Sequence, residues 1–239
     1  MLYVLLPPSE GKAEGGNGRW RETSGTFGRR LGAARDEVVE ALGATTLAPT
    51  KLGARPGPLL DRVTNANRAV AEHRAKALPA HLRYTGVVWE HLRPATLDAH
   101  LRRRILVPSA LLGLVTAEDP VPDHRLKFDV PLDGIGRLDR FWRAHLTNTI
   151  KHHVRPRDTV VELLPQEHAA AIDLEDVAKR RHVVRTTFAG ITGHDAKAVK
   201  GALARHLLTH GLDDEPFAWN GWQSATPTSS TDRVIVVSR

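Results

Sequence analysis

The chain opens on a short apolar run that two prolines stop. Residues 1–6 are rich enough in β-forming side chains to predict a buried strand, and Pro7 and Pro8 cannot extend it because neither donates an N–H to a neighbour. Ser9, Glu10 and Lys12 therefore follow on a loop at a strand end. A hydroxyl, a carboxylate and an amine in one tight turn indicate a functional site, although a solvated turn would have the same composition.

Further β-rich runs predict that this strand belongs to a mixed sheet. Residues 104–109 and 159–164 are runs broken or followed by a proline, and 181–188 and 234–237 are also rich in β-formers. If the first three runs form neighbouring parallel strands, the loops after them share one sheet edge. Open α/β sheets bind ligands at such an edge, so we expect the site there.

Between these runs, apolar residues recur at the spacing of a helix. This spacing predicts helices over 35–42, 60–78 and 195–210, and residues 110–115 start either a helix or a turn. In the last helix Asp195 is a plausible N-cap. We find no repeat and no low-complexity linker, so we expect one α/β domain over 1–239, a mixed sheet with surrounding helices.

The amino-acid composition restricts the kinds of protein that this chain can be. With 239 residues and 41% hydrophobic content the chain can bury a substantial core. It has no apolar run of eighteen residues and no signal-peptide pattern, so we expect a cytoplasmic protein without a membrane partner. The absence of cysteine excludes disulfides, thiolate catalysis and sulfur-based zinc sites.

The charge balance favours an anionic partner. Lys and Arg number 34 against 27 Asp and Glu, which gives a formal net charge of +7. Basic residues gather at 29–30, 102–104, 151–157 and 179–181, as they do on surfaces that follow a phosphate backbone. Solvated, arginine-rich helix faces are the simpler explanation, so charge alone does not decide.

Two local patterns could contact phosphate. Lys197 and Lys200 lie in the first turns of a predicted helix, where the helix dipole already favours an anion. Gly134, Gly136 and Arg137 belong to an apolar-x-Gly-apolar-Gly pattern before a helix, which is typical of the hairpin in helix-hairpin-helix DNA binders. Two solvated lysines and a plain turn between elements are the alternatives.

Other motifs are absent or weak. Gly11 and Lys12 are followed by Ala13, so the phosphate-cradling P-loop pattern is not completed. His124 and His168 do not belong to a cluster with metal-ligand spacing. We therefore expect neither a metal nor a cofactor.

Five short segments in order resemble the YaaA family of bacterial proteins, also called DUF328 or UPF0246, as a divergent member. The segments span nearly the whole chain and are 5–12, 84–89, 107–126, 141–142 and 197–201. The resemblance implies an α/β fold of the YaaA type, a positively charged cleft, a helix-hairpin-helix-like element and DNA binding. It also implies a role in the response to hydrogen peroxide, linked to intracellular iron. His124 and His168 stand where the family usually has tyrosines.

From the residues and the resemblance together we expect a DNA-binding protein of the bacterial peroxide response. The residues expected to touch DNA phosphates, or another anion, are Lys12, Arg125, Gly134, Gly136, Arg137, Lys197 and Lys200. The changed residues in the expected cleft leave a second possibility open.

That alternative is an enzyme acting on a nucleobase, a nucleoside or another small, phosphate-bearing anionic molecule. A desolvated lysine there could act as a nucleophile or base, and carboxylates and imidazoles could act as acids and bases. The candidate catalytic residues are Ser9, Glu10, Lys12, His124, Glu167 and His168.

Overall fold

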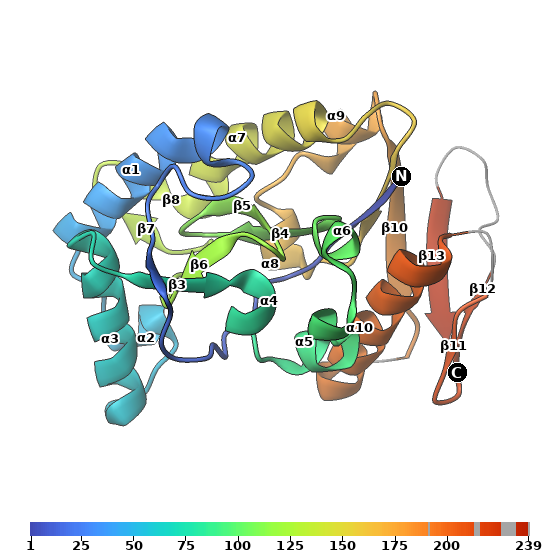
Figure 1. Ribbon diagram of the computed structural model, residues 1–239, viewed down its shortest axis with the longest axis horizontal. Coiled ribbons are helices and arrows are strands. Elements are labelled where there is room, and N and C mark those ends of the chain that lie inside the picture. The colour runs from blue at the N-terminus through green and yellow to red at the C-terminus, as the bar shows by residue number, and fades with distance from the viewer. Residues whose placement is uncertain (191, 213–215, 226–232, 239) are drawn as a thin grey trace.

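The computed structural model describes residues 1–190, 192–212, 216–225 and 233–238, and its centre is an eight-stranded mixed sheet (Figure 1). The strands of this sheet are β1 (Leu2–Leu5), β4 (Ile105–Ser109), β5 (Gly113–Thr116), β9 (Thr159–Glu162), β10 (His182–Phe188), β11 (Ala218–Trp219), β12 (Trp222–Ala225) and β13 (Arg233–Ser238). Their order is β11-β12-β13-β10-β9-β1-β4-β5. The five from β13 to β4 are parallel, and antiparallel partners complete both edges.

The opening strand lies in the middle of this sheet. Val4 of β1 is paired with Val161 of β9 on one side and Ile105 of β4 on the other, and all three side chains are fully buried. Parallel strands that are covered on both faces have such continuous apolar runs. The predicted α/β class and the predicted parallel neighbours are therefore confirmed.

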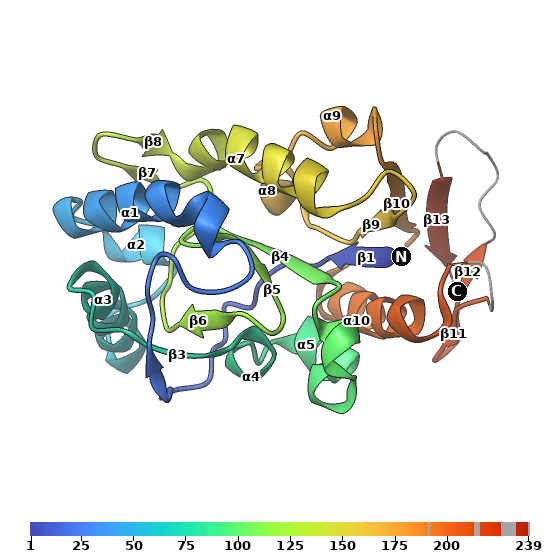
Figure 2. The same cartoon turned by 45° about the horizontal axis from the view of Figure 1, so that its top comes forward.

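Helices cover both faces of the sheet. They are α1 (Gly28–Ala44), α2 (Pro49–Leu52), α3 (Pro58–Ala71), α4 (Ala80–Arg83), α5 (Val87–Leu92), α6 (Ala99–Arg102), α7 (Leu138–His153), α8 (Gln166–Ala169), α9 (Leu174–Ala178) and α10 (Gly193–His210), with a 3-10 turn at Pro94–Thr96. Helices α7 and α9 lie on one side of the central strands, and α5 and α10 lie on the other (Figure 2). Within the described ranges, no helix is both long and apolar enough to cross a membrane.

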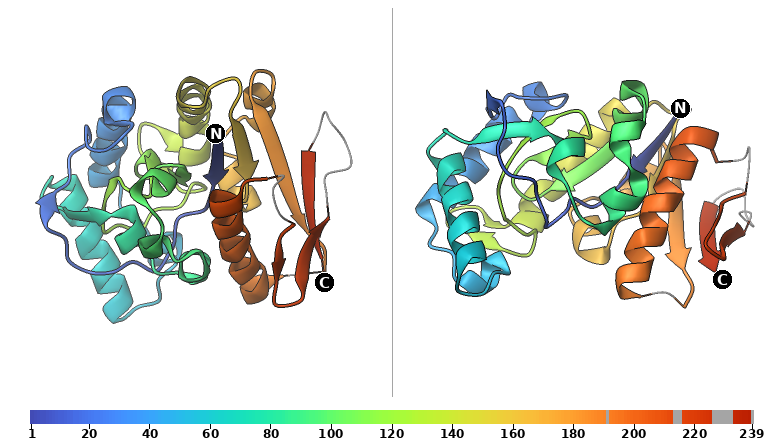
Figure 3. Two further views of the ribbon diagram at one scale, coloured as in Figure 1. Left: turned by 45° about the vertical axis from the view of Figure 1, so that its right-hand side comes forward. Right: turned by 60° about the horizontal axis from the view of Figure 1, so that its bottom comes forward.

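Helices α5 and α10 are packed unusually close together at Gly201 of α10. A Cβ atom on Gly201 would lie 2.3 Å from the carbonyl oxygen of Val88 and 2.9 Å from the Cβ of His91. Only a residue without a side chain allows this approach. The contact fixes where the start of α10 lies relative to the loops that surround it (Figure 3).

Two local predictions were wrong. The helix expected over 60–78 ends at Ala71; His73 follows at a φ of 51°, and strand pairing overrides helical spacing at Lys76–Pro79, which forms β3. Helix α10 begins at Gly193, so Asp195 is not its N-cap. For 110–115 the turn alternative is confirmed: residues 110–112 form a turn, and the chain runs back as β5 from Gly113, which takes a φ of 69° beneath Trp142.

Two small sheets complete the fold. One consists of β2 (Gly18–Arg19), β3 and β6 (Pro120–Pro122), and the other is the hairpin of β7 (Pro131–Leu132) and β8 (Gly136–Arg137). The hairpin leads into α7 as the sequence predicts, but residues 123–130 before it are not helical. Prolines at 120, 122 and 131 disfavour a helix there. Only the hairpin and second helix of a helix-hairpin-helix element are present.

Candidate functional site

A pocket of about 540 Å³ opens at the carboxyl ends of β1, β4 and β9. The loop after β1, the start of α5, residues 124–128, the segment around α8 and the first turns of α10 form its wall. The predicted residues that line it are Ser9, Glu10, Lys12, His124, Arg125, Glu167, His168, Lys197 and Lys200. Side chains from opposite ends of the sequence thus share one cavity at the sheet edge where we expected the site.

The hairpin residues lie elsewhere. Gly134, Gly136 and Arg137 do not line the pocket, and the Arg137 guanidinium is paired with the Asp139 carboxylate at 2.6 Å. Gly134 and Gly136 are exposed and take φ angles of 81° and 72°. The hairpin is therefore a separate exposed feature, and its contact with DNA stays a prediction.

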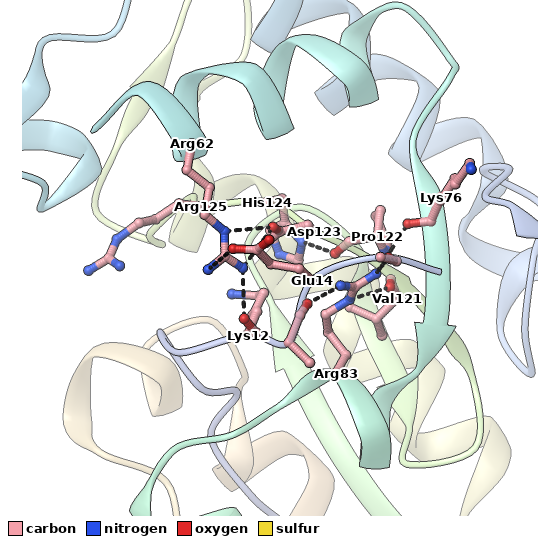
Figure 4. Close-up of polar contacts among 12 residues, drawn as sticks. Lys12, Glu14, Arg62, Lys76, Arg83, Val121, Pro122, Asp123, His124 and Arg125 are labelled. Atoms are coloured by element: carbon pink, nitrogen blue, oxygen red, sulfur yellow. Dashed lines mark hydrogen bonds and ion pairs between the residues drawn. The ribbon is translucent and has the colours of Figure 1, made fainter. Parts of the chain in front are cut away.

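Two arginines hold the loop that carries Lys12 (Figure 4). Arg62 of α3 donates to the Lys12 carbonyl at 2.7 Å and to the Asp123 carboxylate at 3.0 Å. Arg83 of α4 is fully buried and donates to the backbone carbonyls of Val121, Ala13, Gly15 and Lys76. The loop after β1 is consequently fixed against the end of β6.

Lys12 is the most perturbed cation of the pocket. Its Nζ donates to the Ser9 carbonyl at 2.9 Å and lies 5.7 Å from the centre of the Tyr84 ring. Burial lowers the pKa of Lys12 from 10.5 to about 8; Asp123 opposes this change and Arg125 adds to it. The pocket therefore holds an amine with a substantial neutral fraction near physiological pH.

His124 supplies a neutral imidazole. Its side chain is 5% exposed, its Nδ1 lies 2.9 Å from the Pro122 carbonyl and its Nε2 lies 3.5 Å from Ser109 Oγ. Because the Pro122 carbonyl can only accept, Nδ1 carries the proton and Nε2 is left as an acceptor. Burial, followed by the charge of Lys12, lowers the pKa of His124 well below its usual value.

Glu10 occupies the cationic side of the pocket as an internal counterion. Its carboxylate lies 2.7 Å from Arg125 Nη2 and 3.6 Å from Lys127 Nζ, although the Glu10 side chain is 66% exposed. Arg125 is held from behind, since the Asn67 side chain hydrogen-bonds both its backbone N–H and its carbonyl. Glu10 is thus an exposed carboxylate paired with two cations, and the backbone of one of them, Arg125, is held in place by Asn67.

The opposite wall comes from α8 and α10. Burial, with Lys200 as a second cause, lowers the pKa of His168 to about 4, so this imidazole is neutral. Lys200 Nζ lies 5.3 Å from the Phe188 ring centre, and burial lowers its pKa while Glu162 opposes the change. Lys197 is exposed at the rim. Two cations and a helix N-terminus face the cavity from this side.

Four residues that position or complete the site were missed by the sequence analysis. Ser109 and Lys127 line the pocket directly, while Arg62 and Asn67 hold its loops from α3. Ser109 follows a strand as Ser9 does, and that signal could have identified it. For the residues on α3 the sequence offers no signal, because their partners lie about 50 to 60 residues away.

The described residues show no metal site. No three His, Asp or Glu side chains among them are grouped so that they could hold an ion. His124 and His168 each line the pocket. Lys12 acts on His124, whereas His168 has both Lys200 and the carboxylates of Glu10 and Glu167 near it, the latter at 3.4 Å. The chemistry of this donor set suits an anion better than a cation.

Comparison with known proteins identifies the family. The sequence profile described as "Peroxide stress protein YaaA" matches residues 2–222. A UPF0246 protein of Streptomyces coelicolor is 34% identical over 227 residues, covering 90% of this chain and 85% of the relative. One of Corynebacterium glutamicum is 31% identical over 212 residues, with 86% and 84% covered. The chain therefore belongs to the YaaA (UPF0246) family of peroxide stress proteins.

Proposed function

We propose that the protein binds DNA during the peroxide stress response, and that the pocket and its rim contact the phosphate backbone. The observation that supports this most directly is the concentration of cations at one sheet edge. Lys12, Arg125, Lys127, Lys197 and Lys200 line the pocket, against the exposed carboxylates of Glu10 and Glu167. Such an excess attracts polyanions and makes their binding dependent on salt.

The N-terminus of α10 adds to this attraction. The helix has 18 residues, and its N-cap Thr192 forms no side-chain hydrogen bond with the first turn. The first N–H groups of a helix have no partner within the helix, so they can donate to an anion, and the helix dipole is directed the same way. A phosphate bound at this position also balances the positive charges of Lys197 and Lys200 in the first turns.

Removing both lysines of α10 should weaken DNA binding and its salt dependence. We expect Lys197→Ala with Lys200→Ala to lower the affinity for a short duplex about tenfold or more at low salt. The slope of log affinity against log salt should become shallower by about 2, since each lost phosphate contact releases about one counterion fewer. Fluorescence anisotropy at four salt concentrations measures both quantities.

The matched control is Arg29→Ala with Arg30→Ala. These exposed arginines lie at the start of α1, outside the pocket lining, and their loss removes the same net charge. An equal loss of affinity in both double variants would contradict a local site and point to general charge attraction. A salt-independent affinity of the unchanged protein would refute the proposal altogether.

Replacing Glu10, the carboxylate that pairs with the pocket cations, should raise the affinity for DNA rather than lower it. In Glu10→Gln the cations of Arg125 and Lys127 no longer have a carboxylate partner. We expect DNA affinity to rise about three- to tenfold, because a phosphate need not displace Glu10. The same anisotropy titration tests this, with Glu167→Gln as the control for charge removal at an exposed pocket carboxylate that lies beside the His168 imidazole and pairs with no described lysine or arginine. A fall in affinity would show that Glu10 supports the ligand instead.

A second candidate function is an enzyme acting on a nucleoside-like or other small anionic molecule. The observation that favours it is the neutral imidazole of His124 beside Ser109, in a pocket that also contains the depressed-pKa amine of Lys12. A volume of about 540 Å³ suits a ligand of nucleotide size. Consumption of a component from a nucleoside and nucleotide mixture, lost in Lys12→Ala, is the expected result for an enzyme.

A further inference from the structure

Lys12 is one of three pocket lysines, with Lys197 and Lys200, that form no ion pair with a described carboxylate. Arg125 and Lys127 are paired with Glu10, whereas Lys12 Nζ donates only to the Ser9 carbonyl and forms no ion pair with any described carboxylate. The charged groups that act on it are Asp123, Arg125, Glu10 and Arg83, two of each sign. A buried ammonium without a carboxylate partner releases its proton more readily than an exposed one.

The neutral fraction of this amine is chemically significant. With a pKa of about 8, roughly a fifth of Lys12 is neutral at pH 7.4, compared with about one in a thousand for a solvated lysine. A neutral lysine amine is a nucleophile towards carbonyl carbon and forms imines with aldehydes. His124, whose Nε2 carries no proton, lines the same pocket and can accept a hydrogen bond from the reacting groups.

The amine also has a fixed position, which distinguishes it from a surface lysine. Arg62 donates a hydrogen bond to the Lys12 carbonyl, and Arg83 donates one to the next carbonyl, that of Ala13. These bonds fix the backbone position of Lys12 (Figure 4). Lys197 lies exposed on the rim, and Lys200 is directed to the Phe188 ring near Glu162. Among Lys12, Lys197 and Lys200, the three pocket lysines named in the sequence analysis, Lys12 is therefore the best suited to form a covalent bond.

We propose that Lys12 forms a covalent imine with the aldehyde of a phosphate-bearing sugar, whose phosphate is held by Arg125 and the first turns of α10. The inference rests on the proposed anion-binding role of the pocket. The aldehyde could belong to the ring-opened sugar of an abasic site in DNA or to a free sugar phosphate. The neutral amine attacks the carbonyl carbon and a C–N bond forms. The nitrogen gives up its two protons, two protons are taken up by the carbonyl oxygen, and the C–O bond breaks as the C=N bond forms and water leaves.

The experiment traps this imine by reduction. The full chain is incubated with sodium cyanoborohydride and either a duplex containing one abasic site or ribose 5-phosphate. Hydride adds to the imine carbon and a solvent proton to its nitrogen, which leaves a stable secondary amine. We expect one adduct per chain, located on Lys12 by peptide mass spectrometry, and at least a tenfold lower yield in Lys12→Arg. The control Lys51→Arg removes an exposed lysine outside the pocket and should behave as the unchanged protein.

The dependence of the adduct yield on pH provides a second readout. Relative to N-acetyl-lysine amide under the same conditions, the initial rate at Lys12 should be favoured most below pH 8, where only the depressed-pKa amine is appreciably neutral. Inorganic phosphate should slow the reaction of ribose 5-phosphate by competing for Arg125 and α10. Equal labelling of many lysines, an undiminished yield in Lys12→Arg, or no adduct in either arm would overturn the inference.

The proposal of DNA binding and the proposal of an imine at Lys12 can be refuted independently of each other. Salt-sensitive binding of an undamaged duplex without any adduct would remove the imine and leave DNA binding intact. An adduct with ribose 5-phosphate from a protein that does not bind duplex DNA would keep the imine and refute the DNA role. An adduct with the abasic duplex alone assigns the aldehyde to damaged DNA.

Discussion

Arg83→Met should destabilise the protein by about 4 kcal/mol, the largest single effect that we expect. The Arg83 side chain is fully buried and donates to four backbone carbonyls, from Ala13, Gly15, Lys76 and Val121. Methionine fills a similar volume but cannot donate to any of these carbonyls. Each buried acceptor without a partner costs about 1–3 kcal/mol, and the four losses are not independent. Urea unfolding followed by tryptophan fluorescence measures the change.

The control for this variant is Arg30→Met, at an exposed position of α1, which should change stability by less than about 0.5 kcal/mol. Arg83→Met should also weaken DNA binding in the fraction that remains folded, because the loop after β1 loses its anchor to β3 and β6. A stability close to that of the unchanged protein would mean that water or another group satisfies the four carbonyls.

Gly201→Ala should have the second largest effect, from the addition of a single methyl group. The new Cβ would lie 2.3 Å from the Val88 carbonyl oxygen, which belongs to backbone and cannot rotate away. We expect a loss of about 2 kcal/mol, in which overpacking outweighs the better helix propensity of alanine. Because α10 must move away from α5, Lys197 and Lys200 leave the pocket, and DNA affinity should fall as well. Thermal unfolding and anisotropy measure the two effects.

Gly32→Ala provides the matched comparison within α1. A Cβ at this position would meet Thr23 Cγ2 at 3.4 Å, a contact that a small shift of the methyl relieves. The same substitution should therefore be neutral or stabilise the protein by up to about 1 kcal/mol. Similar losses in both variants would show that the close approach of α5 and α10 is not the cause.

The sequence was most informative where the determinants of structure are local. Apolar runs that end at prolines predicted β1, β4 and β9, and the general rule for parallel sheets placed their loops at one edge. That rule brought Ser9, Glu10 and Lys12 to the same cavity as residues from the second half of the chain. The family resemblance pointed to the same loops independently.

The sequence was least informative where tertiary pairing decides. Lys76–Pro79 has apolar residues that suit a helix, yet it forms a strand because β2 and β6 lie on either side of it. Glu10 was a candidate acid or base for the enzymatic alternative, and nothing in the sequence indicated that it would be paired with two cations from a distant segment. No local pattern reports such partners, since they depend on how α3 and the end of β6 are placed.

The central position of β1 has a consequence for how the chain acquires its structure during synthesis. Its parallel neighbours β4 and β9 begin at residues 105 and 159, so β1 has no partner in the large sheet until a distant part of the chain has been made. Such non-local pairing slows folding and leaves an apolar segment exposed to aggregation meanwhile. We therefore expect the apolar segment of β1 to need protection from aggregation until the middle of the sheet closes.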